Sequence, residues 1–400
     1  MTTAILLSIL IIVLLILLLL ILDFRGGRAD HHKKATTATR TNVRYGYPQL
    51  IGDGRAFFEQ LKTDIESASQ TIHLSFFIWK EPGIGTEVLN LLERRARDGV
   101  QVCILVDRLG SSISKSTIQR LRHSGVYFSY IHAPRFPYLF YNLNRRYHRK
   151  IGVIDQKIGY IGGFNVGQEY VSKDPKYGFW RDLHVRVEGQ IVDDLQQLFL
   201  DDWSGAGAPT PLLPQKSMPP GSGEGLQLLY SEGKGVADHL YDWLATAEHS
   251  IRIVTPYYVP GKALQDLLIA KQKNGVNVTV LIPAIEDHNF VKAAAYAYIP
   301  NLLAAGCGIY QYVEGFYHGK AIIVDKRTAL VGSSNFDKRS FHLNDELDLF
   351  LPGSPFVQQL VQTLEDDFAG ARQLTKADVG NRTLLDRAKT RIARWFSEFL

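Results

Sequence analysis

The chain has 400 residues, 46% hydrophobic and 21% charged, a balance that excludes an intrinsically disordered protein and predicts two domains. The formal net charge is +5, but residues 23–46 alone hold six basic and two acidic residues, so the rest is almost neutral. This distribution argues against a nucleic-acid enzyme and favours contact with anionic lipid headgroups. Only two cysteines are present, Cys103 and Cys307, so neither a disulfide framework nor a zinc site is expected.

The first element is an apolar segment without charge, residues 4–22. At about 1.5 Å per residue, a helix of this length spans close to the roughly 30 Å of bilayer hydrocarbon. A cleaved signal peptide is the alternative, but the segment lacks a basic start and a small-residue cleavage site. The basic juxtamembrane linker, residues 23–46, predicts that this flank is cytoplasmic. We therefore expect a single-pass protein of the cell membrane with its body on the cytoplasmic side.

Beyond the linker, the same pattern of predicted helices and apolar strands occurs twice in the chain. The first copy predicts helices over 54–69, 85–98 and 116–124 and strands over 71–79, 100–106 and 126–131. The second predicts helices over 235–248, 261–274 and 291–305 and strands over 250–256 and 276–283. Alternation of this kind indicates the α/β class with parallel strands.

A segment rich in Gly, Pro, Ser and Ala, residues 204–225, separates the two copies and has the composition of a linker. We therefore expect a first domain over 47–203 and a second over 226–370. A helical tail over 371–400 follows. Within it, apolar residues from Leu385 to Phe399 recur at helical spacing among basic ones, which fits either an interfacial helix or a helix packed on the body.

Each copy ends in the same polar motif with the same internal spacing. The motif residues are His148, Lys150, Asp155, Gly162, Gly163 and Asn165, then His318, Lys320, Asp325, Gly332, Ser333 and Asn335. If residues 148–154 form a strand, His148 and Lys150 point to one face and form a cradle for a phosphate oxyanion. The glycines would let the backbone approach the ligand. Two cradles allow one histidine to attack a phosphodiester while the other protonates the leaving alcohol.

The two copies resemble the His-x-Lys-x4-Asp signature of the phospholipase D superfamily, over about residues 46–351. Residues 160–170, 180–184, 255–260 and 335–341 are similar to those of bacterial cardiolipin synthases of the short, single-anchor type. The resemblance implies two duplicated phospholipase D-like α/β domains related by pseudo-two-fold symmetry, plus an N-terminal transmembrane helix. It gives the candidate catalytic residues as His148, Lys150, Asp155, His318, Lys320 and Asp325.

The resemblance also implies a phosphatidyl transfer between two phosphatidylglycerol molecules that needs no metal or cofactor. His148 would attack phosphorus to give a phosphatidyl-histidine, and His318 would protonate the leaving glycerol, although the two roles can be reversed. The remaining roles implied are phosphate binding by Lys150, Asn165, Lys320 and Asn335, support of His318 by Asp182 and of His148 by Glu346, and local structure for Asp155 and Asp325.

Several alternatives stay open. A phospholipase D-type hydrolase would use the same residues with water as acceptor. A phosphodiesterase nuclease is disfavoured because the chain outside residues 23–46 has almost no net charge. A non-catalytic lipid-binding protein would lack a motif residue. The aromatic and arginine-rich segment 134–147 fits either a membrane interface or a loop over the domain boundary. Tyr257, Tyr258 and Phe316 fit an acyl-chain entrance or the core. Expected partners are phosphatidylglycerol and anionic membrane lipids, not nucleic acid. The acceptor lipid and oligomeric state stay open.

Overall fold

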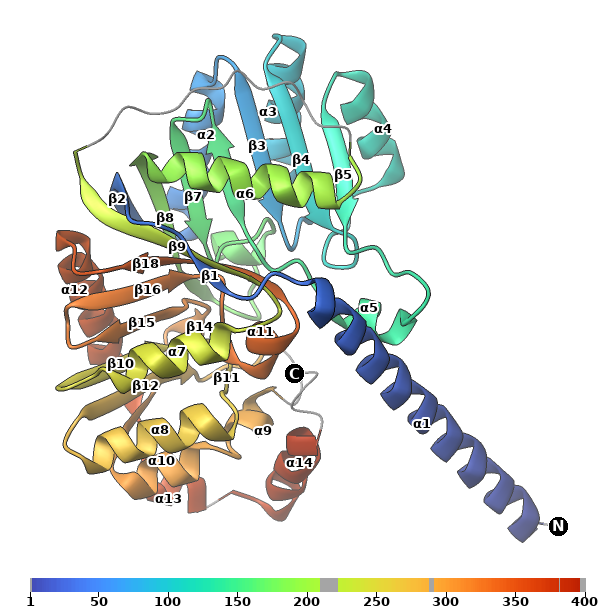
Figure 1. Ribbon diagram of the computed structural model, residues 1–400, viewed down its shortest axis with the longest axis vertical. Helices are drawn as coiled ribbons and strands as arrows, with labels where there is room; N and C mark the ends of the chain where they lie inside the picture. The colour runs from blue at the N-terminus through green and yellow to red at the C-terminus, as the bar shows by residue number, and fades with distance from the viewer. Residues whose placement is uncertain (1, 209–221, 288–290, 381, 396–400) are drawn as a thin grey trace.

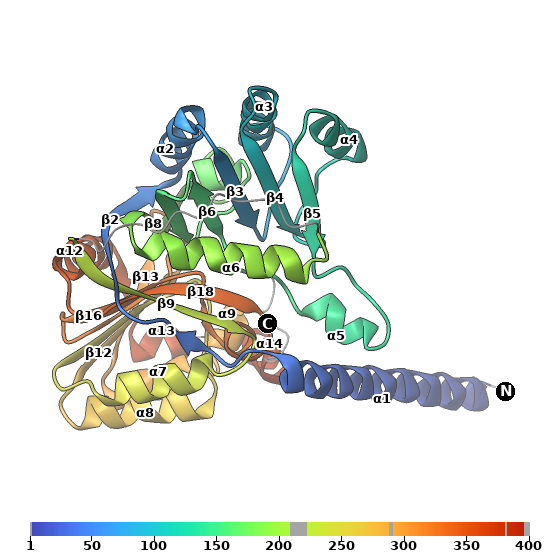
Figure 2. The ribbon, with the colours of Figure 1, turned by 45° about the horizontal axis from the view of Figure 1, so that its top comes forward.

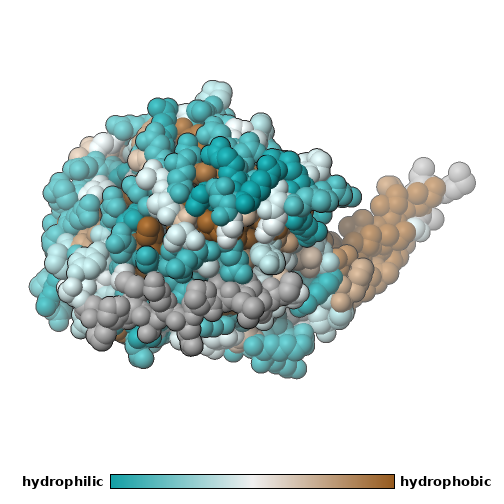
Figure 3. Space-filling model, turned by 90° about the horizontal axis from the view of Figure 1, so that it is seen from above, coloured by the Kyte–Doolittle hydropathy of each residue, from teal (hydrophilic) through white to brown (hydrophobic). Residues whose placement is uncertain are grey.

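The computed structural model describes residues 2–208, 222–287, 291–380 and 382–395. It begins with α1 (Thr2–Lys34), which projects from a body of two sheets with helices on their faces (Figures 1 and 2). Among these residues α1 is the one helix long and apolar enough to cross a membrane. Figure 3 shows this apolar rod beside a mostly hydrophilic body. The helix continues to Lys34, so the expectation of a linker from residue 23 is wrong for residues 23–34, which pack against the body as helix.

The first half is a seven-stranded sheet in the order β5-β4-β3-β6-β7-β8-β2, with the first three strands parallel and the others antiparallel. Its strands are β2 (Arg44–Asp53), β3 (Thr71–Phe76), β4 (Gln101–Asp107), β5 (Tyr127–Ile131), β6 (Ile151–Ile154), β7 (Ile158–Gly162) and β8 (Phe179–Gly189). Its helices are α2 (Gly54–Ser67), α3 (Ile84–Arg97), α4 (Lys115–His123), α5 (Leu139–Asn144), the 3₁₀ turn η1 (Glu169–Val171) and α6 (Ile191–Gly205).

The second half repeats this order as β13-β12-β10-β15-β16-β18-β9. Its strands are β9 (Glu224–Glu232), β10 (Ser250–Val254), β12 (Asn277–Pro283), β13 (Gly308–Tyr312), β15 (Ala321–Val324), β16 (Thr328–Gly332) and β18 (Asp345–Leu351), with the short strands β11 (Tyr258–Val259), β14 (Gly315–Tyr317), β17 (Phe336–Asp337) and β19 (Arg372–Gln373). Its helices are α7 (Val236–Ala245), α8 (Lys262–Lys273), α9 (Val291–Ala295), α10 (Ile299–Ala305), α11 (Lys338–His342), α12 (Pro355–Ala369), α13 (Lys376–Gly380) and α14 (Leu384–Trp395). The duplication expected from the sequence is confirmed.

The two halves form one body because their sheets pair and share a core. β2 pairs with β9, as does the short β1 (Thr39–Arg40), and β14 of the second half pairs with β8 of the first. Helices α6 and α12 pack into a common core with the inner faces of both sheets. The motif at the end of each sheet therefore faces the other half.

Some predicted boundaries differ from the observed ones for identifiable reasons. The predicted helix 291–305 is two helices, because Pro300 occupies the first turn of α10 and cannot donate a backbone hydrogen bond. The predicted linker 204–225 is shorter, since α6 reaches Gly205 and β9 begins at Glu224; residues 209–221 lie outside the described residues. The predicted strand 148–154 is paired within its sheet over residues 151–154 only.

Candidate active site

Each motif histidine is held by the opposite half of the molecule. The His148 backbone N–H donates to the Asp345 carbonyl at 3.0 Å, and the His318 N–H donates to the Arg181 carbonyl at 2.7 Å. His148 therefore does not lie in the strand predicted for it, because its backbone partner belongs to the other half rather than to a neighbour in its own sheet. Both side chains are buried where the two halves meet.

Two acids complete this crossed arrangement, as the resemblance implied. The Nδ1 atom of His148 lies 2.9 Å from Oε2 of Glu346, and the Nδ1 atom of His318 lies 2.5 Å from Oδ2 of Asp182. Asp182 is on β8 and Glu346 on β18, at equivalent places in the two sheets. An acid that accepts the Nδ1 proton fixes the ring and leaves Nε2 with a free lone pair.

Burial controls the protonation of both histidines. It is the largest effect on each, lowering the pKa of His318 to about 4 and that of His148 well below its usual range, and the charges of nearby lysines act in the same direction. Both imidazoles are therefore neutral at pH 7 in the empty site, the form in which Nε2 is a nucleophile or a base.

The two acids differ in charge. Burial raises the pKa of Asp182, but the charge of Lys320 and the hydrogen bonds from His318 and the Leu183 N–H outweigh it and hold this pKa below its usual value. Burial raises the pKa of Glu346 to about 7, although Lys150 and hydrogen-bond donors oppose the rise. Asp182 is therefore ionised at neutral pH, whereas Glu346 is close to half protonated.

The motif lysines are buried beside the histidines. The Lys150 Nζ donates to the His148 carbonyl at 2.7 Å, and the Lys320 Nζ donates to the His318 carbonyl. Burial is the main cause that lowers the pKa of Lys150 to about 7 and that of Lys320 to about 8, and the charge of Lys320 contributes to the lowering at Lys150. A phosphate between these ammonium groups would offset their desolvation and repulsion, so the pair forms an anion site.

The motif aspartates lie outside this cradle and organise the backbone. The carboxylate of Asp155 accepts hydrogen bonds of 2.7–2.8 Å from the backbone N–H groups of residues 69–71, where β3 begins. Asp325 does the same for residues 248–250, where β10 begins, at 2.7–2.9 Å. These bonds outweigh burial and lower the pKa of both groups. The structural role expected for these residues stays a prediction, which these contacts support.

The motif asparagines are not equivalent. The Asn165 Oδ1 accepts a hydrogen bond from the Ile78 N–H at 3.1 Å, and its Nδ2 donates to the Tyr170 hydroxyl at 3.2 Å. Asn335 is also buried, but its Oδ1 has no protein partner among the described residues. The Oδ1 atom and one Nδ2 hydrogen of Asn165 are therefore taken by scaffold contacts, whereas the Oδ1 atom of Asn335 is left without such a partner.

The motif glycine at 163 has a different function from the one its sequence suggested. A Cβ at Gly163 would lie 2.0 Å from the Oδ1 atom of Asp182, so the missing side chain makes room for this acid rather than for a ligand. The equivalent residue in the second half is Ser333, whose hydroxyl donates to Oε2 of Glu346 at 2.6 Å.

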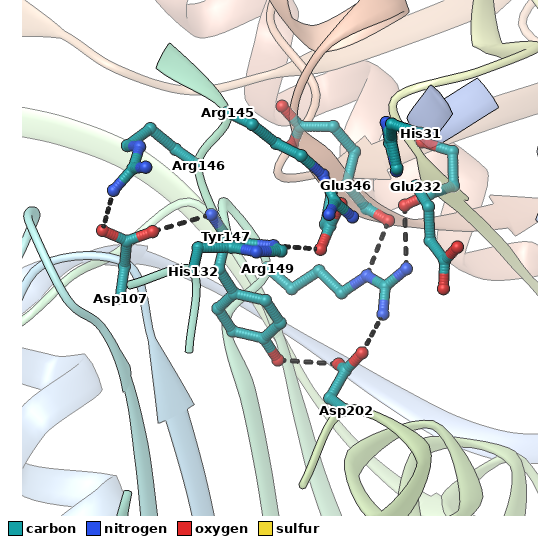
Figure 4. A network of polar contacts seen from close by, with 12 residues as sticks. His31, Asp107, His132, Arg145, Arg146, Tyr147, Arg149, Asp202, Glu232 and Glu346 are labelled. Carbon is teal, nitrogen blue, oxygen red and sulfur yellow. Dashed lines mark hydrogen bonds and ion pairs between the residues drawn. The ribbon is translucent and has the colours of Figure 1, made fainter. Parts of the chain in front are cut away.

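A buried polar network behind His148 was missed by the sequence analysis (Figure 4). The Arg149 guanidinium binds Asp202 on α6 and donates to the carbonyls of Ser231 at 2.8 Å and Glu346 at 3.2 Å. Beside it, Asp345 accepts from Arg145 at 2.7 Å and contacts Nε2 of His132 at 2.6 Å. The only sequence signal was the unequal middle residue of the motif, arginine in one copy and glycine in the other.

Aromatic rings form walls beside the histidines. The ring centroid of Trp180 lies 5.1 Å from that of His318, and the centroid of Phe77 lies 5.2 Å from that of His148. Tyr258 and Phe316, for which an acyl-chain entrance or the core was expected, are buried in the core.

Among the described residues, no group of three or more His, Cys, Asp or Glu side chains is placed to hold a metal ion.

Comparisons with known proteins identify the family of this site. The family model described as cardiolipin synthase, phospholipase D-like domain, matches residues 61–203 and 240–368. A minor cardiolipin synthase, ClsB, of Bacillus subtilis is 37% identical over 384 residues, covering 95% of both chains. The chain belongs to the cardiolipin synthase family of the phospholipase D superfamily, and so to the phosphatidyltransferases.

A further relative and a solved structure are also similar to this chain. The major cardiolipin synthase ClsA of Bacillus subtilis is 36% identical over 360 residues, which cover 88% of this chain and 75% of that protein. The crystal structure of a phosphatidylserine synthase from Haemophilus influenzae covers 90% of this chain and 98% of its own, with a TM-score of 0.70 at 15% identity. The second likeness supports the duplicated fold alone.

Proposed function

We propose that the protein synthesises cardiolipin by transferring a phosphatidyl group from one phosphatidylglycerol to another, with release of glycerol. The observation that carries this proposal is the pair of buried histidines, each oriented by an acid of the opposite half and each beside a buried lysine. Relatives that span almost the whole chain carry the name cardiolipin synthase.

In the first step, the Nε2 lone pair of neutral His148 attacks phosphorus, a P–N bond forms and the P–O bond to glycerol breaks. His318 gives a proton to the departing glycerol oxygen. The negative substrate phosphate raises the pKa of His318 from its low value in the empty site, and ionised Asp182 stabilises the imidazolium. Lys150 and Lys320 hold the non-bridging oxygens as charge develops.

In the second step, a hydroxyl of another phosphatidylglycerol gives its proton to His318 and attacks the same phosphorus. The P–N bond breaks, His148 is regenerated and cardiolipin leaves. This assignment gives the acid–base role to the histidine with the ionised partner, because that carboxylate stabilises a protonated imidazole better than the partly neutral Glu346.

The site is proposed to work at the cytoplasmic face of the cell membrane. The apolar part of α1 is long enough to span the bilayer, and the basic residues that follow it favour the cytoplasm. Phosphatidylglycerol and other anionic lipids are the expected partners on that side, because the basic juxtamembrane residues attract their headgroups.

The test uses purified protein in mixed micelles with labelled phosphatidylglycerol and chelator, and mass spectrometry of the products. Cardiolipin and glycerol in equal amounts are expected, with a loss of at least about 10³-fold in His148→Ala and in His318→Ala. Lys376→Ala, an exposed lysine on α13, is the control and should keep full activity. Phosphatidic acid without cardiolipin would make water the acceptor and the protein a phospholipase. Lack of any product would contradict both.

A further inference from the structure

The polar end of the anchor helix is fixed to the body. The Phe24 ring meets that of Tyr141 edge-on, with 5.4 Å between centroids, and the Asp23 carboxylate accepts a 2.9 Å hydrogen bond from the Tyr141 backbone. A Cβ at Gly27 would lie 2.5 Å from that of Tyr141, so this approach requires glycine. Because α1 is one continuous helix, this contact with α5 fixes how the body faces the bilayer.

The C-terminal helix α14 lies toward the side of the body from which α1 projects (Figures 1 and 2). It is attached by one face to α9. Ala393 is buried in a cluster with Val259 and Ala294, and the Arg382 guanidinium, just before the helix, lies 4.1 Å from the ring centroid of Tyr296. The helix is therefore docked on the second half of the body.

The remaining surface of α14 is amphipathic. Leu385 is 65% exposed and Ile392 is 51% exposed, and their spacing of seven residues places them on one face. The exposed Lys389 and Arg391 lie on the two flanks of that face. Apolar residues between basic flanks suit a lipid surface with negative headgroups, whereas a water-exposed face would not need them.

We propose that α14 is a second membrane contact, in which Leu385 and Ile392 enter the headgroup region of an anionic bilayer while Lys389 and Arg391 bind lipid phosphates. Charge complementarity and the direction of the anchor both identify the occupant as a lipid surface. The inference rests on the placement of the anchor and not on the reaction proposed above.

This second contact places the active site between two points on the membrane. The first contact, α1 with α5, belongs to the first half and leads directly into His148. The second, α14 on α9, belongs to the other half. Near it, the Tyr257 hydroxyl binds Asp287, whose charge raises the pKa of Lys320. Each half thus has its own membrane contact.

The experiment uses the full chain in nanodiscs that contain phosphatidylglycerol. Cys103 and Cys307 are buried, so Leu385→Cys and Ile392→Cys each accept a fluorescent label selectively. Lipids with a spin label near the headgroup are expected to quench both probes several-fold. The control is Tyr127→Cys at the first position of β5, an exposed residue of the first half, whose probe should be unaffected.

The charge variant Lys389→Glu/Arg391→Glu, with the probe at 385, should lose most of the quenching, while Lys376→Glu on α13 should keep it. Probes at 385 and 392 that stay water-exposed and unquenched would overturn the proposal. Probes that are shielded from water but not quenched by lipid would also overturn it, in favour of a second protein chain on this face. The readout needs no turnover, so it stays valid if the proposed reaction is wrong.

Discussion

The two halves of the molecule have the same strand order and the same motif, yet they surround their acids differently. In the first half Gly163 leaves room for Asp182, whereas in the second the Ser333 hydroxyl binds Glu346. The residues that follow Gly163 and Asp182 in the chain differ as well. In the first half, the Phe164 ring stacks on that of His184.

In the second half the same two positions hold Ser334 and Asp348, which are hydrogen-bonded to each other. Both copies therefore have the same histidines and lysines, but the residues around their acids differ in polarity. One acid is ionised and the other is only partly ionised at neutral pH, which gives two similar histidines unequal basicity when substrate binds. Each prediction below breaks or sharpens this comparison.

The largest expected effect separates the two histidines by role. A phosphatidyl substrate with a p-nitrophenol leaving group needs no general acid. With it, His318→Ala should release nitrophenol in a single turnover at a rate within about tenfold of the unchanged protein, while His148→Ala should lose about 10³-fold or more. Rapid-mixing absorbance measures this. The opposite pattern would assign the nucleophile to His318.

Substitution of the two acids should also reduce activity unequally. Asp182→Asn removes an ionised partner of a histidine, so we expect cardiolipin synthesis to fall by about 10²–10⁴-fold. Glu346→Gln replaces a group whose pKa is already raised to about 7, so the expected loss is only about tenfold. Initial rates at pH 7 for both variants measure the difference. Equal losses would show that the two acids have equivalent roles.

Exchanging the residues that contact the two acids, Gly163 and Ser333, tests the same difference between Asp182 and Glu346. Gly163→Ser places a side chain where the Asp182 carboxylate lies, so its loss of activity should approach that of Asp182→Asn. Ser333→Gly removes one donor to Glu346 and should lower the free energy of unfolding by about 1 kcal/mol and the activity by less than about tenfold. Thermal denaturation and initial rates check both. A harmless Gly163→Ser would contradict the packing around Asp182.

The smallest effect concerns pH. Lys150 and Lys320, with pKa values lowered to about 7 and about 8, lose their charge as the pH rises, so kcat/KM should fall above pH 7. The charge of Asp348 raises the pKa of Lys150, so Asp348→Asn should move this alkaline limb to lower pH by roughly 0.3 units. The pH profile of kcat/KM measures it, and a shift to higher pH would contradict the assignment to Lys150.

The sequence was sufficient for elements that depend on local signals. Apolar strands between amphipathic helices predicted β3, β4, β5, β10 and β12, and Gly99 and Gly125 follow their helices with positive φ. The crossed pairs of histidine and acid followed from the resemblance, since Asp182 and Glu346 lie far in the chain from the histidines they contact.

Other features were beyond the sequence because they depend on contacts between distant segments. The backbone bond from His148 to Asp345 replaces the strand pairing that an alternating pattern suggested. The purpose of Gly163 became clear only with Asp182 beside it. Residues 23–34 have a linker-like composition, but their packing on Tyr141 holds them as helix.

The pairing of β2 bears on how the chain is made. Arg44 pairs with Leu226, and Gly46 pairs with Gly189, so this strand close to the anchor waits for partners that are synthesised much later. The hydrophobic helix leaves the ribosome first and can enter the bilayer while that strand is still unpaired. The first half therefore cannot close its sheet edge until the second has begun, which makes the duplicated body fold as one unit beside the membrane.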